Sequence, residues 1–196
     1  MNRERRIAAV GWAATEEWAV WNVGEAANQA EQLAAARVSD PVAARAAAAG
    51  IRALDQHALT QAGTWSLGVW LPDPYSGRAA ATVLVRTVAP DGPRRLTLDE
   101  LHEWAGRPPR ARGVRITDCA AGTGELAVGP AVLQMVEMVP RFSRRITTQL
   151  NWFVLPPGTS DTVLCQFETE HPDLVAALGV ESNVVTDNLV ITLEDA

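Results

Sequence analysis

The hydrophobic pattern of this chain changes its period near Thr64, and that change limits the fold more than any other feature. Before it, residues 24–63 are rich in Ala, Glu and Gln, with apolar residues at helical spacing. After it come short runs rich in Val, Leu and Trp, separated by turn sequences such as "PDPYSGR" and "PPGTSD". This order is typical of an α+β domain in which helices cover an antiparallel sheet.

Two helices are predicted before the change. The first spans 24–37, and the second begins at Ser39 or Asp40 as N-cap, with Pro41 in its first turn, and ends at Gly63. In the second helix the apolar residues form one stripe, and its many alanines favour close packing against a neighbour.

The rest of the chain predicts a sheet of about six strands flanked by helices. "TWSLGVWL" and "AATVLVRTV" form a hairpin over 64–88, and a short helix capped by Thr97 and ended by Gly106 follows. The remaining strands are "RGVRITDCA", "AVLQMVEMV", "RITTQLNWFVL" and "TVLCQF". From Pro172 onward helical spacing returns, although the Val-rich "NLVITL" also fits a strand.

The N-terminal segment 1–37 is predicted as a hairpin over 5–23 followed by the first helix, packed on the rest of the molecule. The spacing of Trp18 and Trp21 equally suits a helical face, so that alternative stays open. No repeat or long linker divides the chain, and residues 1–196 are therefore expected to form a single domain.

Composition restricts the function. The hydrophobic fraction of 47% is typical of a globular protein, and the net charge of −6 argues against nucleic acid as a partner. All seventeen cations are arginines, so no lysine exists to form a Schiff base or to bind phosphate in a P-loop. The apolar run near the N-terminus is shorter than that of a signal peptide, and no stretch is long enough to span a membrane. A cytoplasmic location is expected, with Cys119 and Cys165 as buried small hydrophobic residues.

The glycine-rich stretch "AGTGELAVGPAV" at 120–131 raises the question of a phosphate-binding loop. Such a loop needs a helix directly after its glycines, so that the helix N-terminus faces the anion. The residues that follow, "PAVLQMVEM", alternate as in a strand, and the GK[ST] ending of a P-loop is missing. The stretch is therefore predicted to be a turn between two strands.

The segments "GPAVLQMVEM" and "LNWFVLPPGTSDTVLCQFETEHPDL" resemble the C-terminal half of small actinobacterial proteins with a PsbP-like fold, which is shared with a Ran-binding nuclear-import factor. The resemblance implies an αβα sandwich. It brings no catalytic residues, because proteins with this fold are known mostly as binding and assembly factors. The matching positions are Gly129, Pro130, Ala131, Trp152, Pro157, Gly158, Asp161, Phe167, Thr169 and Pro172.

Aromatic and arginine side chains are the candidate contacts for a protein partner, because Trp and Arg are favoured in interaction hot spots. Most of the seven tryptophans are expected in the core, but three lie in the N-terminal segment that the resemblance explains least. The arginines of "PRFSRR" form a second candidate contact, with a solvated turn as the alternative. The predicted binding residues are Trp12, Trp18, Trp21, Arg141, Arg144 and Arg145.

No nucleophile with an adjacent base is evident, and the position that would complete an HExxH motif after His102 and Glu103 holds Gly106. The protein is thus expected to be a non-catalytic binding or assembly module without cofactors. Its partner would be a protein, in a secretion-accessory, chaperone-like or immunity role, and a homo-oligomer is possible. The alternative is a metal-dependent or small-molecule enzyme that uses Glu168, Glu170 and His171, although these also suit a solvated helix start.

Overall fold

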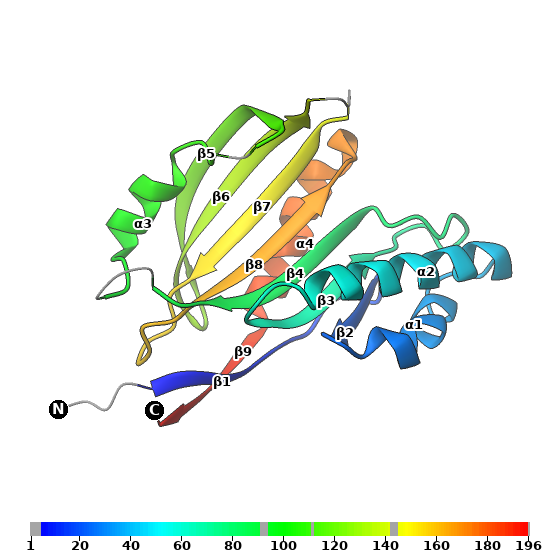
Figure 1. The fold of residues 1–196 in the computed structure, drawn as a ribbon, viewed down its shortest axis with the longest axis horizontal. Helices are drawn as coiled ribbons and strands as arrows, with labels where there is room; N and C mark the ends of the chain where they lie inside the picture. The colour runs from blue at the N-terminus through cyan, green and yellow to red at the C-terminus, as the bar shows by residue number, and fades with distance from the viewer. Residues whose placement is uncertain (1–4, 91–93, 111, 142–144, 196) are drawn as a thin grey trace.

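The structure is a computed structural model that describes residues 5–90, 94–110, 112–141 and 145–195 (Figure 1). Within these residues it has four α-helices and nine strands. The helices are α1 (Ala26–Ala35), α2 (Pro41–Ala58), α3 (Leu98–Ala105) and α4 (Val175–Asp187), the last preceded by a 3₁₀ turn at Pro172–Leu174. The strands are β1 (Arg5–Trp12), β2 (Trp18–Asn22), β3 (Thr64–Trp70), β4 (Ala81–Val88), β5 (Val114–Leu126), β6 (Gly129–Pro140), β7 (Thr147–Val154), β8 (Thr162–Thr169) and β9 (Leu189–Asp195).

Seven strands form one antiparallel sheet in the order β2-β3-β4-β8-β7-β6-β5, and β1 pairs with β9 in a separate two-stranded sheet. The predicted α+β class with an antiparallel sheet flanked by helices is confirmed. The predicted number of about six strands is too low, because β2 adds an edge strand to the main sheet. The predicted hairpin of β3 and β4 forms, and β4 then pairs with β8, which is distant in sequence.

The N-terminal hairpin prediction is wrong. Two strands do form within 5–23, but β1 pairs with β9 and β2 pairs with β3, where Trp18 lies opposite Trp70. The two indole rings stack with their centroids 6.2 Å apart, and Trp18 is only 1% exposed. Pairing with distant strands buries more aromatic surface than a local hairpin of these residues can.

One helix end differs from the prediction, and the structure decides between the two alternatives for the end of the chain. α2 begins as expected, because the Asp40 side chain accepts a hydrogen bond of 2.7 Å from the Ala43 amide, but it ends at Ala58. Gly63 instead takes a positive φ of 76° in the turn before β3. The Val-rich end of the chain forms strand β9, as in the second of the two predicted alternatives, because β1 offers it an unpaired edge.

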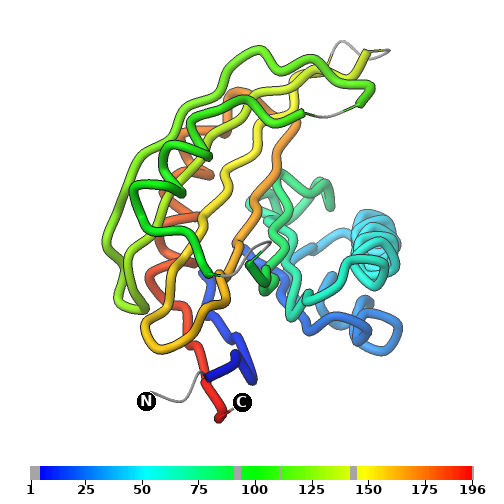
Figure 2. Tube along the Cα trace, turned by 60° about the vertical axis from the view of Figure 1, so that its left-hand side comes forward, coloured from blue at the N-terminus to red at the C-terminus, as the bar shows by residue number. Residues whose placement is uncertain are grey.

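Helices cover both faces of the main sheet. α4 packs on one face, where Leu178 and Val185 join the core formed by β4, β7 and β8. On the other face α1 and α2 cover β2, β3 and β4, and α3 covers β5 and β6 (Figures 1 and 2). The two groups of helices are separated on this face, and the strands β8 and β7 lie between them (Figure 1). We call the same-face residues between them the central stripe: Arg86, Gln149, Asn151, Leu164, Gln166 and Glu168.

Candidate functional site: an apolar cleft beside α3

Six of the seven tryptophans have structural roles, and the three predicted to bind a partner are among them. Trp18 and Trp21 are 1% and 3% exposed, and Trp12 is half-buried. The indole N–H of Trp12 donates to Ser66 Oγ at 2.8 Å, and that of Trp18 donates to Glu181 Oε2 at 2.9 Å. The structure thus removes Trp18 and Trp21 from the candidate surface, because core packing uses their rings and internal acceptors use their N–H groups.

The predicted arginine contact follows β6. Arg141 is exposed and its backbone amide donates to the Gly113 carbonyl at 2.8 Å, while Arg144 lies outside the described residues. Arg145 Nη1 lies 2.9 Å from Glu170 Oε2, and both side chains are exposed. An exposed ion pair of this kind contributes little to stability.

The acidic alternative site is not assembled as a metal centre. Glu168 Oε2 accepts a hydrogen bond of 2.7 Å from Gln149, and Glu170 pairs with Arg145. The backbone amide of His171 donates to Thr169 Oγ1 at 3.0 Å, which shapes the turn into the following 3₁₀ helix. Among the described residues, no group of three or more His, Cys, Asp and Glu side chains has an arrangement that could hold a metal ion.

Trp104 on α3 is the exception among the tryptophans. Its side chain is 50% exposed, and its indole N–H has no acceptor within the described part of the chain. The ring packs edge-on against Phe153 of β7, with centroids 5.4 Å apart and an interplanar angle of 86°. One signal in the sequence could have identified this residue, since Trp104 lies in the last turn of a short amphipathic helix that is followed by a double proline.

A capping box fixes the start of α3. Thr97 Oγ1 accepts a hydrogen bond from the Glu100 amide, and the Glu100 carboxylate accepts one from the Thr97 amide at 2.8 Å. Both guanidinium Nη atoms of Arg94 also donate to Glu100, each at 2.7 Å. These bonds, with Arg94 as the largest cause, lower the pKa of Glu100 to about 2. On the inner side of the helix, Leu101 and Ala105 are buried against the sheet.

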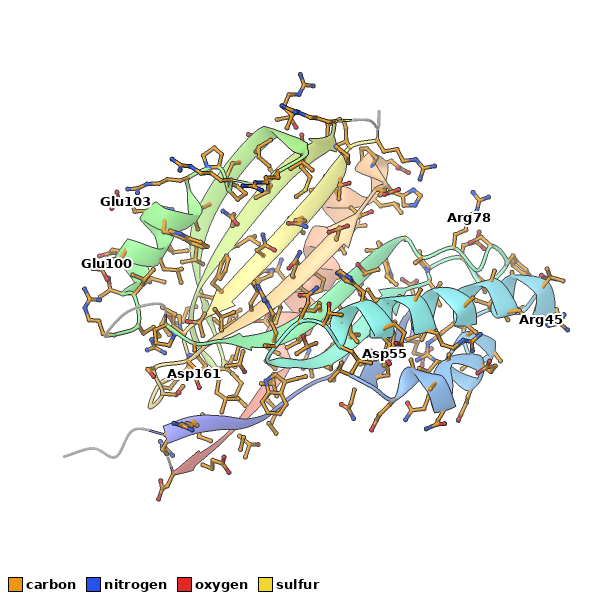
Figure 3. The ribbon with its side chains drawn as sticks, in the orientation of Figure 1. Arg45, Asp55, Arg78, Glu100, Glu103 and Asp161 are labelled. Carbon is orange, nitrogen blue, oxygen red and sulfur yellow. The ribbon has the colours of Figure 1, made fainter. Side chains whose placement is uncertain are left out.

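A cleft of about 520 Å³ opens between α3, the ends of β4 and β7, and the start of β8. Its volume lies within the range of about 300–1,000 Å³ that is usual for ligand-binding sites. Glu100 and Glu103 point away from the sheet on the outer side of α3 (Figure 3), so the cleft lies on the apolar side of that helix. The lining residues are Val88, Ala89, Pro90, Arg94, Arg95, Leu96, Leu101, Trp104, Phe153, Leu155 and Thr162.

Trp104 separates this cleft from a second hollow of about 280 Å³, which Gln134 and residues 107–110 complete. The wall opposite α3 is held in place by Arg95, whose Nη1 donates to the Pro156 carbonyl at 2.8 Å. Burial lowers the pKa of Arg95, and Asp161 partly opposes that shift.

The lining of the cleft is mostly apolar. Of the described residues that line the cleft, Thr162 alone carries a hydroxyl group, the two arginines are the charged members, and the others are apolar. Sequence reasoning missed this cleft because its walls come from three regions that are distant in the chain.

A scan against models of protein families finds no match for the sequence, and a search among curated proteins finds no significant relative. In the described residues, no helix is both long and apolar enough to cross a membrane.

Proposed function

We propose that this protein is a non-catalytic binding or assembly module, and that its partner protein docks an apolar side chain into the cleft beside α3. The exposed Trp104 carries this proposal. A half-exposed tryptophan at the mouth of an apolar cleft, with arginines at the rim, has the composition of an interaction hot spot. Six other tryptophans are bound into the fold, so the exposure of this one is not explained by a general excess of tryptophan.

The fold is consistent with that role. An antiparallel sheet with helices on both faces is what a resemblance to PsbP-like proteins implies, and such proteins act mostly as binding and assembly factors. We propose a cytoplasmic accessory or chaperone-like role, and the acidic balance of the chain suggests an immunity role as the other form of the same function. The geometry does not favour a metal-dependent enzyme at this cluster, since Glu168 and Glu170 bond to Gln149 and Arg145 rather than to a shared centre.

The test compares partner recovery by two variants with that by the natural protein. The tagged natural protein, Trp104→Ala and Tyr75→Ala are each expressed in the native cell and recovered, and the associated proteins are quantified by mass spectrometry. Tyr75 is a matched control because it is an exposed aromatic residue, 73% accessible, on the loop between β3 and β4. We expect Trp104→Ala to lose at least one specific protein that Tyr75→Ala retains.

Equal recovery of all associated proteins by the two variants would contradict the proposal. Thermal unfolding of each variant is the control, because Trp104 also packs on Phe153. Truncation of a half-exposed tryptophan should lower the midpoint by only a few degrees, so that folded protein remains for the comparison.

A further inference from the structure

The central stripe contains an arginine whose side chain has no partner in the described part of the chain. Arg86 on β4 is half-buried, and its Nε atom is buried without a hydrogen-bond acceptor. Among the described residues its side chain forms no hydrogen bond or ion pair. A guanidinium N–H that loses water without gaining an acceptor costs free energy, and an anion bound by the guanidinium group offsets part of this cost.

The strand register places Arg86 beside the cleft. Arg86 lies opposite Leu164 of β8, and Leu164 lies opposite Phe153 of β7, so the three side chains form one row on the same face. At about 4.8 Å between neighbouring strands, the backbones of Arg86 and Phe153 are about 10 Å apart. Val88, the next same-face residue on β4, already lines the cleft. The unpaired cation therefore adjoins the apolar cleft.

A second unpaired atom lies in the next row. Gln134 Nε2 donates to the Ala105 carbonyl at 2.6 Å, and Asn151 Nδ2 donates to Gln134 Oε1 at 3.2 Å. A carbonyl can only accept, so this chain of bonds fixes the orientation of both amides and leaves Asn151 Oδ1 as the free end. That oxygen is buried without a donor, in a side chain that is 8% exposed. Among the described residues, the Arg86 side chain thus has no acceptor and Asn151 Oδ1 has no N–H donor.

The sequence segment that supplies one side of the cleft has a charge opposite in sign to that of the whole protein. Residues 86–115 contain seven arginines against four acidic residues, whereas the whole chain has a net charge of −6. Two of these arginines, Arg94 and Arg95, line the cleft itself. The local excess of cations favours an acidic partner at this face.

We infer that the partner contributes an acidic peptide segment, in which a carboxylate binds Arg86 while a neighbouring bulky apolar side chain fills the cleft. This inference rests on the proposed function, because it specifies which kind of partner the cleft beside α3 accepts. A peptide fits best, since it supplies the carboxylate and the apolar group from one short stretch of chain.

The test uses a displayed library of random peptides, selected separately on the natural protein, Arg86→Gln, Arg86→Lys and Arg78→Gln. Arg78 is the matched control, an exposed arginine on the loop between β3 and β4 (Figure 3). The natural protein and Arg78→Gln should enrich peptides that combine Asp or Glu with a nearby bulky apolar residue. Arg86→Gln should retain the apolar residue and lose the acidic one, and Arg86→Lys should restore part of the acidic preference.

The contribution of the pair between Arg86 and the peptide carboxylate is then measured from the affinities of one enriched peptide. Glu→Gln (or Asp→Asn) in that peptide should weaken binding to the natural protein by at least about tenfold, as for a charged hydrogen bond, and should not weaken binding to Arg86→Gln further. The inference would be overturned by enrichment without an acidic preference or by no enrichment at all. It would also be overturned if the small carboxylate 1-naphthaleneacetate bound as tightly as the enriched peptide. Undiminished peptide binding by Trp104→Ala would overturn the proposed function instead, so the two failures are distinguishable.

Discussion

At the scale of single residues, indole N–H groups connect parts of the chain that are far apart in sequence. Trp70 Nε1 donates to Glu17 at 2.7 Å, and Trp152 Nε1 donates to Ser182 of α4 at 3.2 Å. Trp21 Nε1 donates to Asp55 Oδ1 at 3.0 Å, inside the core formed by α1, α2 and the sheet. A buried indole therefore contributes both apolar area and a directional bond that fixes how two elements meet.

Asp55 should be critical for stability, and its isosteric variant Asp55→Asn should lose less free energy of unfolding than its truncated variant Asp55→Ala. Its Oδ1 atom accepts from Trp21 and, at 2.8 Å, from the Gly24 amide, while the residue is 1% exposed. Asp55→Ala leaves both donors without an acceptor and should lower the free energy of unfolding by about 2–5 kcal/mol. Asp55→Asn keeps an oxygen acceptor and should cost clearly less. Urea unfolding measures both, and equal losses would contradict this account.

At the scale of elements, the turn between β5 and β6 shows why a glycine stands at its end. β5 ends at Leu126 and β6 begins at Gly129, which lies opposite it, so the chain reverses within two residues. Gly129 has a φ of 131°, and a Cβ atom there would lie 2.7 Å from the Leu155 carbonyl oxygen. The predicted connection between two strands is confirmed, and an extended strand, not a helix, follows Gly129. The turn is shorter than the predicted 120–131, because residues 120–126 belong to β5 and residues 129–131 belong to β6.

Gly129→Ala should therefore destabilise the protein, and Gly122→Ala in the same stretch is the matched control. The strained backbone alone costs about 1–3 kcal/mol, and displacement of the Leu155 backbone adds to it. Gly122 has ordinary backbone angles and open space around a built Cβ atom, so its substitution should be nearly neutral. Urea unfolding of the two variants checks this. Similar losses at both positions would show that general flexibility, not close approach, explains Gly129.

The contribution of the α3 capping box to stability should depend on pH. The pKa of Glu100 is lowered from its ordinary value of 4.5 to about 2, first by the hydrogen bonds from Arg94 and then by that from the Thr97 amide. A carboxylate with a lowered pKa stabilises the folded state at pH values above the pKa that it has in the unfolded chain. This contribution is lost as pH falls from about 4.5 to about 2. We expect NMR titration of the Glu100 carboxyl carbon to give a midpoint near the lower end of this window.

Arg94→Gln supplies the control for that titration. It should raise the Glu100 pKa more than Thr97→Ala does, because the Arg94 side chain is the largest cause of the shift. A Glu100 midpoint that stays in place in Arg94→Gln would contradict the assignment of that cause.

At the scale of the whole molecule, the strands differ in how much of the structure protects them. β8 lies between β4 and β7 at the centre of the main sheet, and Val163, Cys165 and Phe167 on it are fully buried. Burial raises the pKa of the Cys165 thiol to about 12, in keeping with its predicted role as a core residue. By contrast β9 pairs only with β1, and Val190 on it is 64% exposed.

Hydrogen exchange should reproduce this ranking. Amides of β8 are expected to exchange only through global unfolding, while those of β9 exchange through local opening of the two-stranded sheet at a lower free energy. Exchange followed by NMR or mass spectrometry, in increasing urea, distinguishes the two routes. Equal protection of β8 and β9 would show that the two sheets open as one unit.

Local signals were enough to predict several elements from the sequence. The Asp40 and Thr97 caps located the starts of α2 and α3, and alternation after the glycines located β6. These signals succeed because capping and periodicity act between residues only a few positions apart. By itself, then, the sequence determined the class of fold, most of its elements and the absence of a phosphate loop at 120–131.

Only the tertiary structure decided which strands pair and which tryptophan reaches the surface. β1 finds its partner at the other end of the chain, and β4 pairs with β8 across the helix α3 and three strands. In sequence Trp104 and Trp18 look alike, yet one is 50% exposed and the other 1%. The physical reason is that burial depends on what packs against a side chain from distant segments, and that depends on the free energy of the whole fold rather than on neighbouring residues.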